Sequence, residues 1–116
     1  MAKDEINIAI AEVCQWREIQ AFLGGLFGLP PDTWKGRRNY LPGLGKCEVP
    51  NFASDLNAMH EAENVLTVNQ RNAYVNHLDS MVGEVEDQVE RDFLWCCASA
   101  SRRAEAFLRT IGKWKD

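Results

Sequence analysis

One segment constrains the fold of this 116-residue chain more than any other. Residues 28–51 contain all four prolines and four of the eight glycines. Proline removes a backbone donor and breaks helices, and glycine favours turns, so no helix is expected to run through this segment. We therefore predict a long irregular loop over residues 28–51, with helices on both sides of it. A loop of this length is usually functional or holds short extended pieces.

The region before the loop begins with a helix. Its apolar residues recur at helical spacing, at Ile6, Ala9, Ile10 and Val13. Asp4 is placed to cap its N-terminus. Two interpretations stay open for residues 16–22, which either continue this helix or form a short strand after a break. Three glycines are expected to end any regular element before the loop: Gly24, Gly25 and Gly28.

Two helices are predicted directly after the loop. The first follows Asn51 or Ser54, and its apolar face contains Leu56, Met59, Ala62, Val65 and Leu66. The next begins with a capping box formed by Thr67 and Gln70. Its buried stripe is expected to contain Tyr74, Val75, Leu78 and Met81.

A further helix is predicted near the end of the chain. Its apolar stripe runs through Val89, Phe93, Cys97, Ala100, Ala104, Phe107, Leu108 and Ile111, and Gly112 ends it. The run ASASRRAEAF within it is rich in small residues. Small residues let a second backbone approach closely, so we expect this helix to be central to the packing.

The chain contains four cysteines, at Cys14, Cys47, Cys96 and Cys97. No pair has the Cys-x-x-Cys spacing of a zinc site, and the sequence does not start with the basic segment of a secretory signal. We therefore expect buried, reduced thiols. No apolar run approaches the roughly 20 residues that a membrane span needs. We expect no membrane association and a cytoplasmic location.

The sequence contains no recognisable catalytic or cofactor-binding motif. His60 and Glu61 open like a metalloprotease HExxH motif, but Asn64 stands where the second histidine is needed. Neither a GxSxG elbow nor a phosphate-binding P-loop occurs. We expect His60 to be structural, and we expect no metal, no cofactor and no enzymatic activity.

The loop holds the clearest candidate for partner binding: Trp34, Arg37, Arg38 and Tyr40. Aromatic and guanidinium groups together are typical of interaction hot spots. The alternative interpretation is that Trp34 and Tyr40 fold back to cover the core. Binding of nucleic acid through Lys35, Arg37, Arg38 and Lys46 is less favoured, because the chain carries a net charge of −4.

A second candidate lies on two of the predicted helices. Asp55, Asn57 and His60 form a polar strip on one helix, and Arg102, Arg103 and Glu105 form another on the last. We predict a polar network between the two helices, which is either structural or a ligand site. In the ligand hypothesis, a homo-oligomer captures a nucleotide with Arg102, Arg103 and Arg109.

Three stretches resemble a group of small phage and prophage proteins with the fold label "phage ABA sandwich". These are PNFASDLNAMHEAENVLT (Pro50 to Thr67), ASASRRAEAFLRTIGKW (Ala98 to Trp114) and INIAIAEVCQW (Ile6 to Trp16). The resemblance implies an α+β domain with a few short strands and a phage-encoded accessory protein in the cytoplasm of the bacterial host. It implies no particular activity. The group tends to have glycine where this chain has Gln15.

Together, the patterns and the resemblance predict one small globular domain over residues 1–116. Its expected class is α+β and mainly α, with about four helices, a few short strands and the long loop. The leading functional hypothesis is a non-enzymatic accessory protein that binds and modulates or inhibits a host bacterial protein, for example a defence component. The alternatives are capture of a nucleotide-like ligand by an oligomer and an accessory role in nucleic-acid binding.

Overall fold

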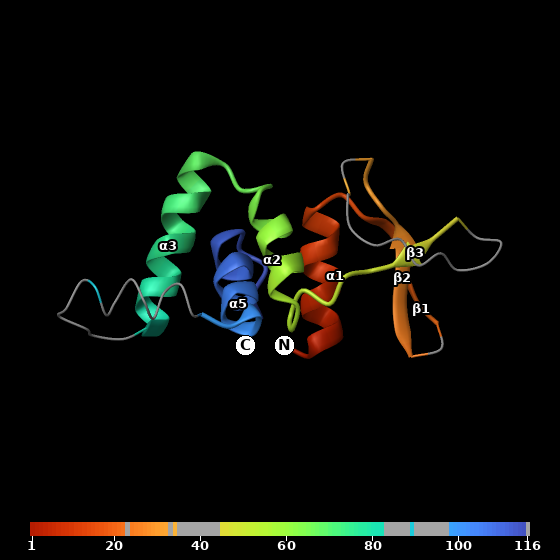
Figure 1. Cartoon of the computed structure of the whole chain (residues 1–116), viewed down its shortest axis with the longest axis horizontal. Coiled ribbons are helices and arrows are strands. Elements are labelled where there is room, and N and C mark those ends of the chain that lie inside the picture. Colours follow the sequence, from red (N-terminus) through yellow and green to blue (C-terminus); the bar gives the residue numbers. More distant parts are fainter. Residues whose placement is uncertain (23, 33, 35–44, 83–88, 90–97, 116) are drawn as a thin grey trace.

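The computed structural model describes residues 1–22, 24–32, 34, 45–82, 89 and 98–115 (Figure 1). These residues form α1 (Lys3–Val13), α2 (Leu56–Glu63), α3 (Val68–Val82) and α5 (Ala100–Thr110). They also form one antiparallel sheet of three short strands. The predicted class, α+β and mainly α, is confirmed.

The helix α5 lies between α3 and α2, and it contacts α1, α2 and α3 (Figure 1). Its small residues Ala104 and Ala106 are fully buried, as are Phe107 and Leu108. The alanines leave room for neighbouring helices, and the two larger side chains fill the space between them. The predicted central position of this helix is therefore confirmed.

The helical core extends from α3 through α5 to α1, and the sheet lies beyond α1 at the far end of the molecule (Figure 1). The molecule is elongated, with extents of 55 × 26 × 23 Å. The largest fully buried side chains are Phe52, Phe107, Ile10, Met59, Leu78, Leu108 and Cys47. Complete burial of one such aliphatic or aromatic side chain contributes about 1.5–3 kcal/mol.

The sheet settles the open question about residues 16–22 in favour of a strand. β1 (Arg17–Phe22) pairs with β2 (Gly25–Leu29), and β2 pairs with β3 (Cys47–Glu48). The β1–β2 register places Ala21 opposite Leu26 and shifts between Arg17 and Gln20. The shift marks a bulge, which locally twists this edge of the sheet.

The prediction that glycines end all regular structure before the loop was wrong for Gly25 and Gly28, because both lie within β2. The reason is close backbone approach. A Cβ atom at Gly28 would lie 3.1 Å from the carbonyl oxygen of Arg17 and 3.1 Å from Ile19 Cγ1. The turn between the strands uses Gly24, whose φ is +81°.

The predicted loop over residues 28–51 begins too early, because β2 continues to Leu29. β3 (Cys47–Glu48) is a short extended piece of the kind that the sequence allowed within the loop. Lys46, directly before β3, adds a side-chain hydrogen bond to β1, because its Nζ donates to Gln20 Oε1 at 3.0 Å. Most of the intervening segment, residues 33 and 35–44, lies outside the described residues.

The start of α1 also differs from the prediction. The N-cap is Ala2, and no side chain caps the helix there. Asp4 lies in the first turn instead, where a carboxylate complements the positive end of the helix dipole. At the other end, Gln15 adopts a φ of +74° and stops the helix without a glycine.

The helix α2 begins one residue later than the later of its two predicted starts, because Asp55 rather than Ser54 is its N-cap. The side chain of Asp55 caps α2 by accepting from the N–H groups of Asn57 at 3.0 Å and Ala58 at 3.3 Å. The predicted capping box of α3 is confirmed. Thr67 N–H donates to Gln70 Oε1 at 2.9 Å, and Gln70 N–H donates to Thr67 Oγ1 at 3.2 Å.

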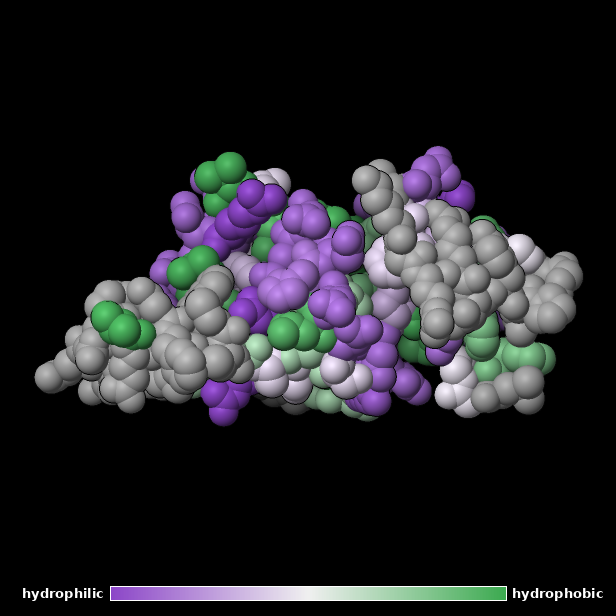
Figure 2. Space-filling model, in the orientation of Figure 1, coloured by the Kyte–Doolittle hydropathy of each residue, from purple (hydrophilic) through white to green (hydrophobic). Residues whose placement is uncertain are grey.

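Four residues assigned to apolar faces are exposed: Leu56 by 39%, Val65 by 44%, Val75 by 39% and Val89 by 78%. The buried side chains in and directly after α2 include Met59, Ala62 and Leu66. Those on α3 are Tyr74 and Leu78. The apolar stripes are therefore narrower than predicted. Figure 2 shows hydrophobic surface at the upper end of α3, where Val68 is 72% exposed.

The predicted final helix from Val89 to Ile111 is interrupted. Ala98 and Ser99 are not helical, and the Ser99 hydroxyl accepts from Arg102 N–H at 3.2 Å to cap α5. Serine favours the N-cap position because its side chain satisfies an unpaired helix donor. Phe93 and Cys97 lie outside the described residues. Gly112 ends α5 as predicted, with a φ of +75°.

The described helices include none with the length and apolar character that a membrane span requires.

Candidate functional site

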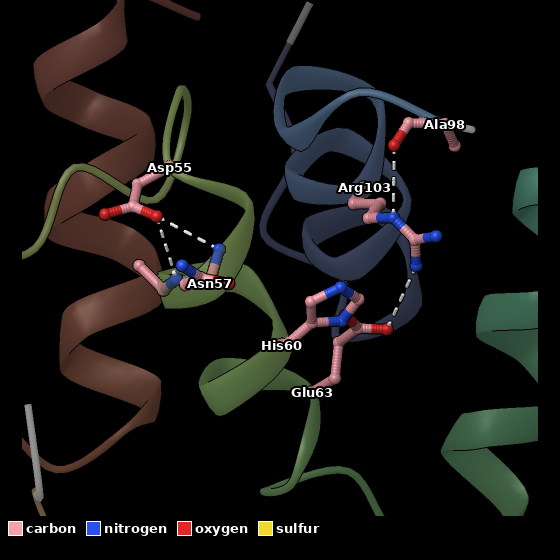
Figure 3. A network of polar contacts seen from close by, with 7 residues as sticks. Asp55, Asn57, His60, Glu63, Ala98 and Arg103 are labelled. Atoms are coloured by element: carbon pink, nitrogen blue, oxygen red, sulfur yellow. Dashed lines mark hydrogen bonds and ion pairs between the residues drawn. The ribbon is translucent and has the colours of Figure 1, made fainter. Parts of the chain in front are cut away.

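The predicted polar network between α2 and α5 exists in part, and Glu63 is at its centre (Figure 3). Glu63 Oε2 lies 3.5 Å from Arg103 Nη1, which joins α2 to α5. Glu63 Oε1 lies 3.0 Å from His60 Nδ1 on the same helix. The spacing of three residues places His60 and Glu63 on one helical face.

Arg103 is the buried cation of this network. Its exposure is only 3%, and its Nε donates to the carbonyl oxygen of Ala98 at 3.2 Å. A buried charge is costly unless it is paired and hydrogen-bonded. Glu63 supplies the opposite charge, and Ala98 supplies an acceptor just before α5 begins. Arg103 therefore holds α2, α5 and the segment before α5 together.

Tyr74, on α3, lies beside the Glu63–Arg103 pair. Its side chain is buried, and its hydroxyl makes no hydrogen bond of standard geometry to the described residues. Burial raises the pKa of Tyr74 well above its ordinary range, and the negative charge of Glu63 raises it further. The hydroxyl therefore stays neutral beside the Glu63–Arg103 pair.

The other predicted members of the network lie elsewhere. Asp55 caps the start of α2 and binds backbone rather than a side chain of α5. Glu105 Oε2 accepts from Arg109 Nε at 3.1 Å, and Arg109 lies 5.4 Å above the ring of Trp114. The predicted strips thus divide into a helix cap, a three-residue network and a separate pair on α5. Asn57 and Arg102 are exposed and contribute backbone N–H groups to caps.

The sequence patterns did not single out Asn7, which is a buried polar residue. Asn7 is 5% exposed, and its Nδ2 donates to Asn51 Oδ1 at 3.1 Å. Its Oδ1 accepts from Ala53 N–H at 3.0 Å. Asn7 therefore attaches α1 to the segment that precedes α2. The available signal was an amide beside Ile6 on the inward face of the first helix.

Trp34 is the only residue of the predicted loop site among those the structure describes. It is half-buried and packs edge-on against Trp16, with ring centroids 5.6 Å apart and an interplanar angle of 67°. Its backbone N–H donates to the carbonyl oxygen of Pro31 at 3.0 Å. Trp34 thus packs against the core as the alternative interpretation expected. Arg37, Arg38 and Tyr40 lie outside the described residues.

A small hollow of about 50 Å³ lies beside Trp34. Trp16, Phe52 and Ala62 are buried among its lining residues, whereas Glu61 and Val65 are exposed. The full set of described lining residues is Cys14, Trp16, Pro31, Trp34, Phe52, Glu61, Ala62 and Val65. The hollow therefore has a mainly apolar interior and a carboxylate-bearing residue in its lining.

The thiols show the effect of this apolar environment. Cys47 is fully buried, as predicted, whereas Cys14 is only partly buried. Burial raises the pKa of the Cys14 thiol to about 12. A neutral thiol is a poor nucleophile, so the environment of Cys14 disfavours thiolate chemistry. Cys96 and Cys97 lie outside the described residues.

A wider groove of about 450 Å³ lies between α1 and the segment after α5. Its lining residues include Glu5 and Glu12 from α1, and Lys113 and Lys115 from the other side. Ile8 and Ala9 add apolar surface between the charged groups. The groove therefore presents charges of both signs and does not select one sign of ligand.

The described part of the chain contains no group of three His, Cys, Asp or Glu side chains arranged to hold a metal ion. Comparisons with protein-family models, with curated proteins and with solved structures found no match to this chain.

Proposed function

We propose that this chain is a non-enzymatic accessory protein of phage or prophage origin that binds a host bacterial protein in the cytoplasm and modulates or inhibits it. A defence component is the kind of target that we have in mind. The observation that carries the proposal is the position of Trp34 next to a small hollow. A rigidly packed aromatic beside a pocket is typical of interaction hot spots.

The use of the polar groups supports a binding role over catalysis. Asp55 caps a helix, Glu63 neutralises the buried Arg103, and Glu105 pairs with Arg109. Each of these carboxylates thus has a structural partner in the fold. A general acid or base must instead reach a substrate.

The nucleotide hypothesis receives less support from the arginines. Arg103 is buried and engaged with Glu63 and Ala98, and Arg109 is engaged with Glu105 and Trp114. A phosphate bound by these arginines would have to replace existing partners.

The test is capture of a host protein by the tagged full-length chain from bacterial lysate. Wild type is compared with Trp34→Ala and with the double variant Trp34→Ala, Arg37→Ala. We expect one stoichiometric protein with wild type and its loss with both variants. The reason is that removing the aromatic side chain removes the proposed anchor.

Trp114→Ala is the matched control, because Trp114 is another half-buried tryptophan but lies in the segment after α5. It should retain capture. Circular dichroism and thermal unfolding establish that each variant is folded. Retained capture by a folded Trp34→Ala variant, or equal loss in Trp114→Ala, would contradict the proposed site.

A further inference from the structure

We infer that the outer edge of β1 pairs with the same edge of a second copy of this chain, so that the two small sheets join into one antiparallel sheet. The inference goes beyond the function proposed above, because it concerns self-association alone. It follows from the open edge of β1, the direction of its backbone groups, their symmetry and the unequal length of the two edges of the sheet.

The outer edge of β1 is open. The strand order is β1–β2–β3, so β1 is an outer strand of the sheet, at the end of the molecule beyond α1 (Figure 1). Within the part of the chain that the structure describes, β1 pairs with β2 alone, and its residues make no other backbone hydrogen bond. The exposed residues of the strand are Arg17, Glu18, Ala21 and Phe22. An exposed strand edge is a template on which a further strand can pair.

The contacts of β2 fix the direction in which Ala21 turns its backbone groups. Ala21 lies opposite Leu26, in the part of the β1–β2 ladder where the register is regular. The Leu26 carbonyl oxygen accepts from the backbone N–H of Val49 at 2.8 Å, so Leu26 faces β3 rather than β1. Because hydrogen-bonded and non-hydrogen-bonded pairs alternate in an antiparallel ladder, Ala21 must also turn away from β2. The N–H and the carbonyl group of Ala21 therefore both point to the open edge.

These two groups make the edge self-complementary. A two-fold axis beside Ala21 places this residue opposite its own copy, and each Ala21 N–H then donates to the carbonyl oxygen of the other. The same pairing sets Phe22 opposite Gln20 of the second copy. Ala21 has a small side chain and neither flanking residue carries a charge, so no like charges meet at the centre of the pairing. The backbone pattern of β1 therefore fits a second β1 in antiparallel orientation.

The unequal edges of the sheet favour a closed dimer over an open chain of sheets. β1 has six residues, whereas β3, at the other edge, has two. Pairing of β1 with β3 of the next molecule would use only two residues and would leave an edge on which growth continues. The bulge between Arg17 and Gln20 restricts the pairing to the second half of β1. So short an interface buries less than the about 1,200 Å² of a stable one, and the dimer is therefore expected to be weak.

Sedimentation equilibrium of the isolated full-length protein measures the self-association. The weight-average mass should rise from that of the monomer toward twice that value between about 10 μM and 1 mM. Ala21→Pro removes the N–H at the axis and should stay monomeric, and an edge strand tolerates proline where its N–H faces solvent. Ala21→Ser is the matched control, because it keeps the N–H and a small side chain, and it should associate as wild type does.

Two further variants test the same axis without proline. Ala21→Lys keeps the N–H but places two ammonium groups opposite each other, which should weaken the association about fivefold. Ala21→Cys should form an intermolecular disulfide on air oxidation, because the Cα atoms of a hydrogen-bonded pair lie about 5.5 Å apart. Arg17→Cys, at an exposed position on the same strand, is the matched control and should not cross-link. Circular dichroism establishes that each variant is folded.

The inference is overturned if wild type stays monomeric up to about 1 mM. It is equally overturned if folded Ala21→Pro and Ala21→Lys variants associate as strongly as wild type, or if the mass exceeds that of a dimer. Equal cross-linking of Ala21→Cys and Arg17→Cys would contradict the axis beside Ala21. A monomeric wild type that captures a host protein, with capture lost in Ala21→Pro, would assign the edge to that partner and overturn pairing with a second copy.

Discussion

Gln15 and Gly112 occupy the same position in two copies of the same helix-ending motif. Their φ angles are +74° and +75°. After α1, the backbone N–H of Trp16 donates to the carbonyl oxygen of Ala11, and that of Gln15 donates to Glu12. After α5, the backbone N–H of Lys113 donates in the same way to Leu108, and that of Gly112 donates to Arg109. Both are Schellman motifs, in which one residue adopts a left-handed conformation. Glycine fills that position in one copy and glutamine in the other.

The first prediction concerns Gln15. A residue with a Cβ atom is strained in the left-handed region, whereas glycine is not. Gln15→Gly should therefore raise the free energy of unfolding by about 1 kcal/mol, with the larger chain entropy of unfolded glycine offsetting part of the gain. Urea denaturation monitored by circular dichroism measures the change.

Gly112→Gln provides the reciprocal variant. A Cβ at Gly112 meets no atom within 4 Å, so the substitution tests conformation rather than packing. It should lower the free energy of unfolding by about 1 kcal/mol. Stabilisation by Gly112→Gln, or destabilisation by Gln15→Gly, would contradict the assignment of equivalent left-handed caps.

The second prediction concerns the two partners of the buried ion pair. Glu63→Leu leaves the buried Arg103 without its carboxylate, and we expect a loss of about 2–3 kcal/mol. Arg103→Met should cost less, because Glu63 is partly exposed and also lies beside His60. Chemical denaturation of both variants measures this asymmetry.

The double variant Glu63→Leu, Arg103→Met sharpens the test. Replacing both charges with apolar groups removes the unpaired charge, so it should be more stable than Glu63→Leu alone. Equal losses in the two single variants, with simple additivity in the double variant, would show that the pair does not determine stability here.

The third prediction is an alkaline effect of Tyr74. Its pKa in the folded protein is raised, so the unfolded chain loses the phenolic proton at lower pH than the folded chain does. The stabilisation is therefore complete below about pH 10 and decreases as pH rises above that value, by at most about 1.4 kcal/mol per pH unit.

Tyr74→Phe should remove this dependence. Because the hydroxyl makes no hydrogen bond of standard geometry to the described residues, the variant should change stability by less than about 1 kcal/mol at pH 7. The free energy of unfolding measured near pH 8 and above pH 10 should fall less in Tyr74→Phe than in wild type. An equal fall of the free energy of unfolding in wild type and Tyr74→Phe would rule out Tyr74 as the cause of the alkaline destabilisation.

The fourth prediction concerns the reactivity of Cys14. Burial raises its pKa to about 12, so at pH 8 very little of it is thiolate in the folded protein. Alkylation by iodoacetamide should be about a thousandfold slower than in the denatured chain. Peptide mass spectrometry gives the rate for each cysteine. A native rate close to the denatured rate would contradict the burial of this thiol.

Local signals explain which parts of the fold the sequence predicted. The capping box of Thr67 and Gln70 involves residues three positions apart, so its pattern carries its own geometry. Gly112 ended α5 for the same local reason. The central position of α5 followed from its small residues, which have meaning only at a close packing surface.

The errors arose where distant residues decide the structure. Gly28 belongs to a strand because the Arg17 backbone approaches it, and nothing near Gly28 in the sequence shows this. Gln15 stops a helix in a conformation that glutamine rarely adopts, so the sequence left residues 16–22 open. Exposure of Val65 and Val75 depends on which side of each helix faces α5.

The candidate sites were also predicted where local signals decide and missed where contacts between distant residues decide. The sequence singled out His60 and Arg103 by residue type, but it did not place Glu63 between them, because that depends on the packing of α2 on α5. Trp34 was singled out by composition. Its neighbours in the hollow, Trp16, Phe52 and Glu61, come from three separate parts of the chain. Only the tertiary structure brings them together.

The position of α5 in the fold has a consequence for synthesis on the ribosome. α1, α2 and α3 all contact α5, yet α5 is translated after all of them. For the seconds that the ribosome needs to reach α5, the inward faces of the earlier helices lack their main packing partner. A nascent chain that stops before Ala100 would keep those faces exposed, so premature termination should yield a substrate for chaperones and proteases rather than a folded fragment.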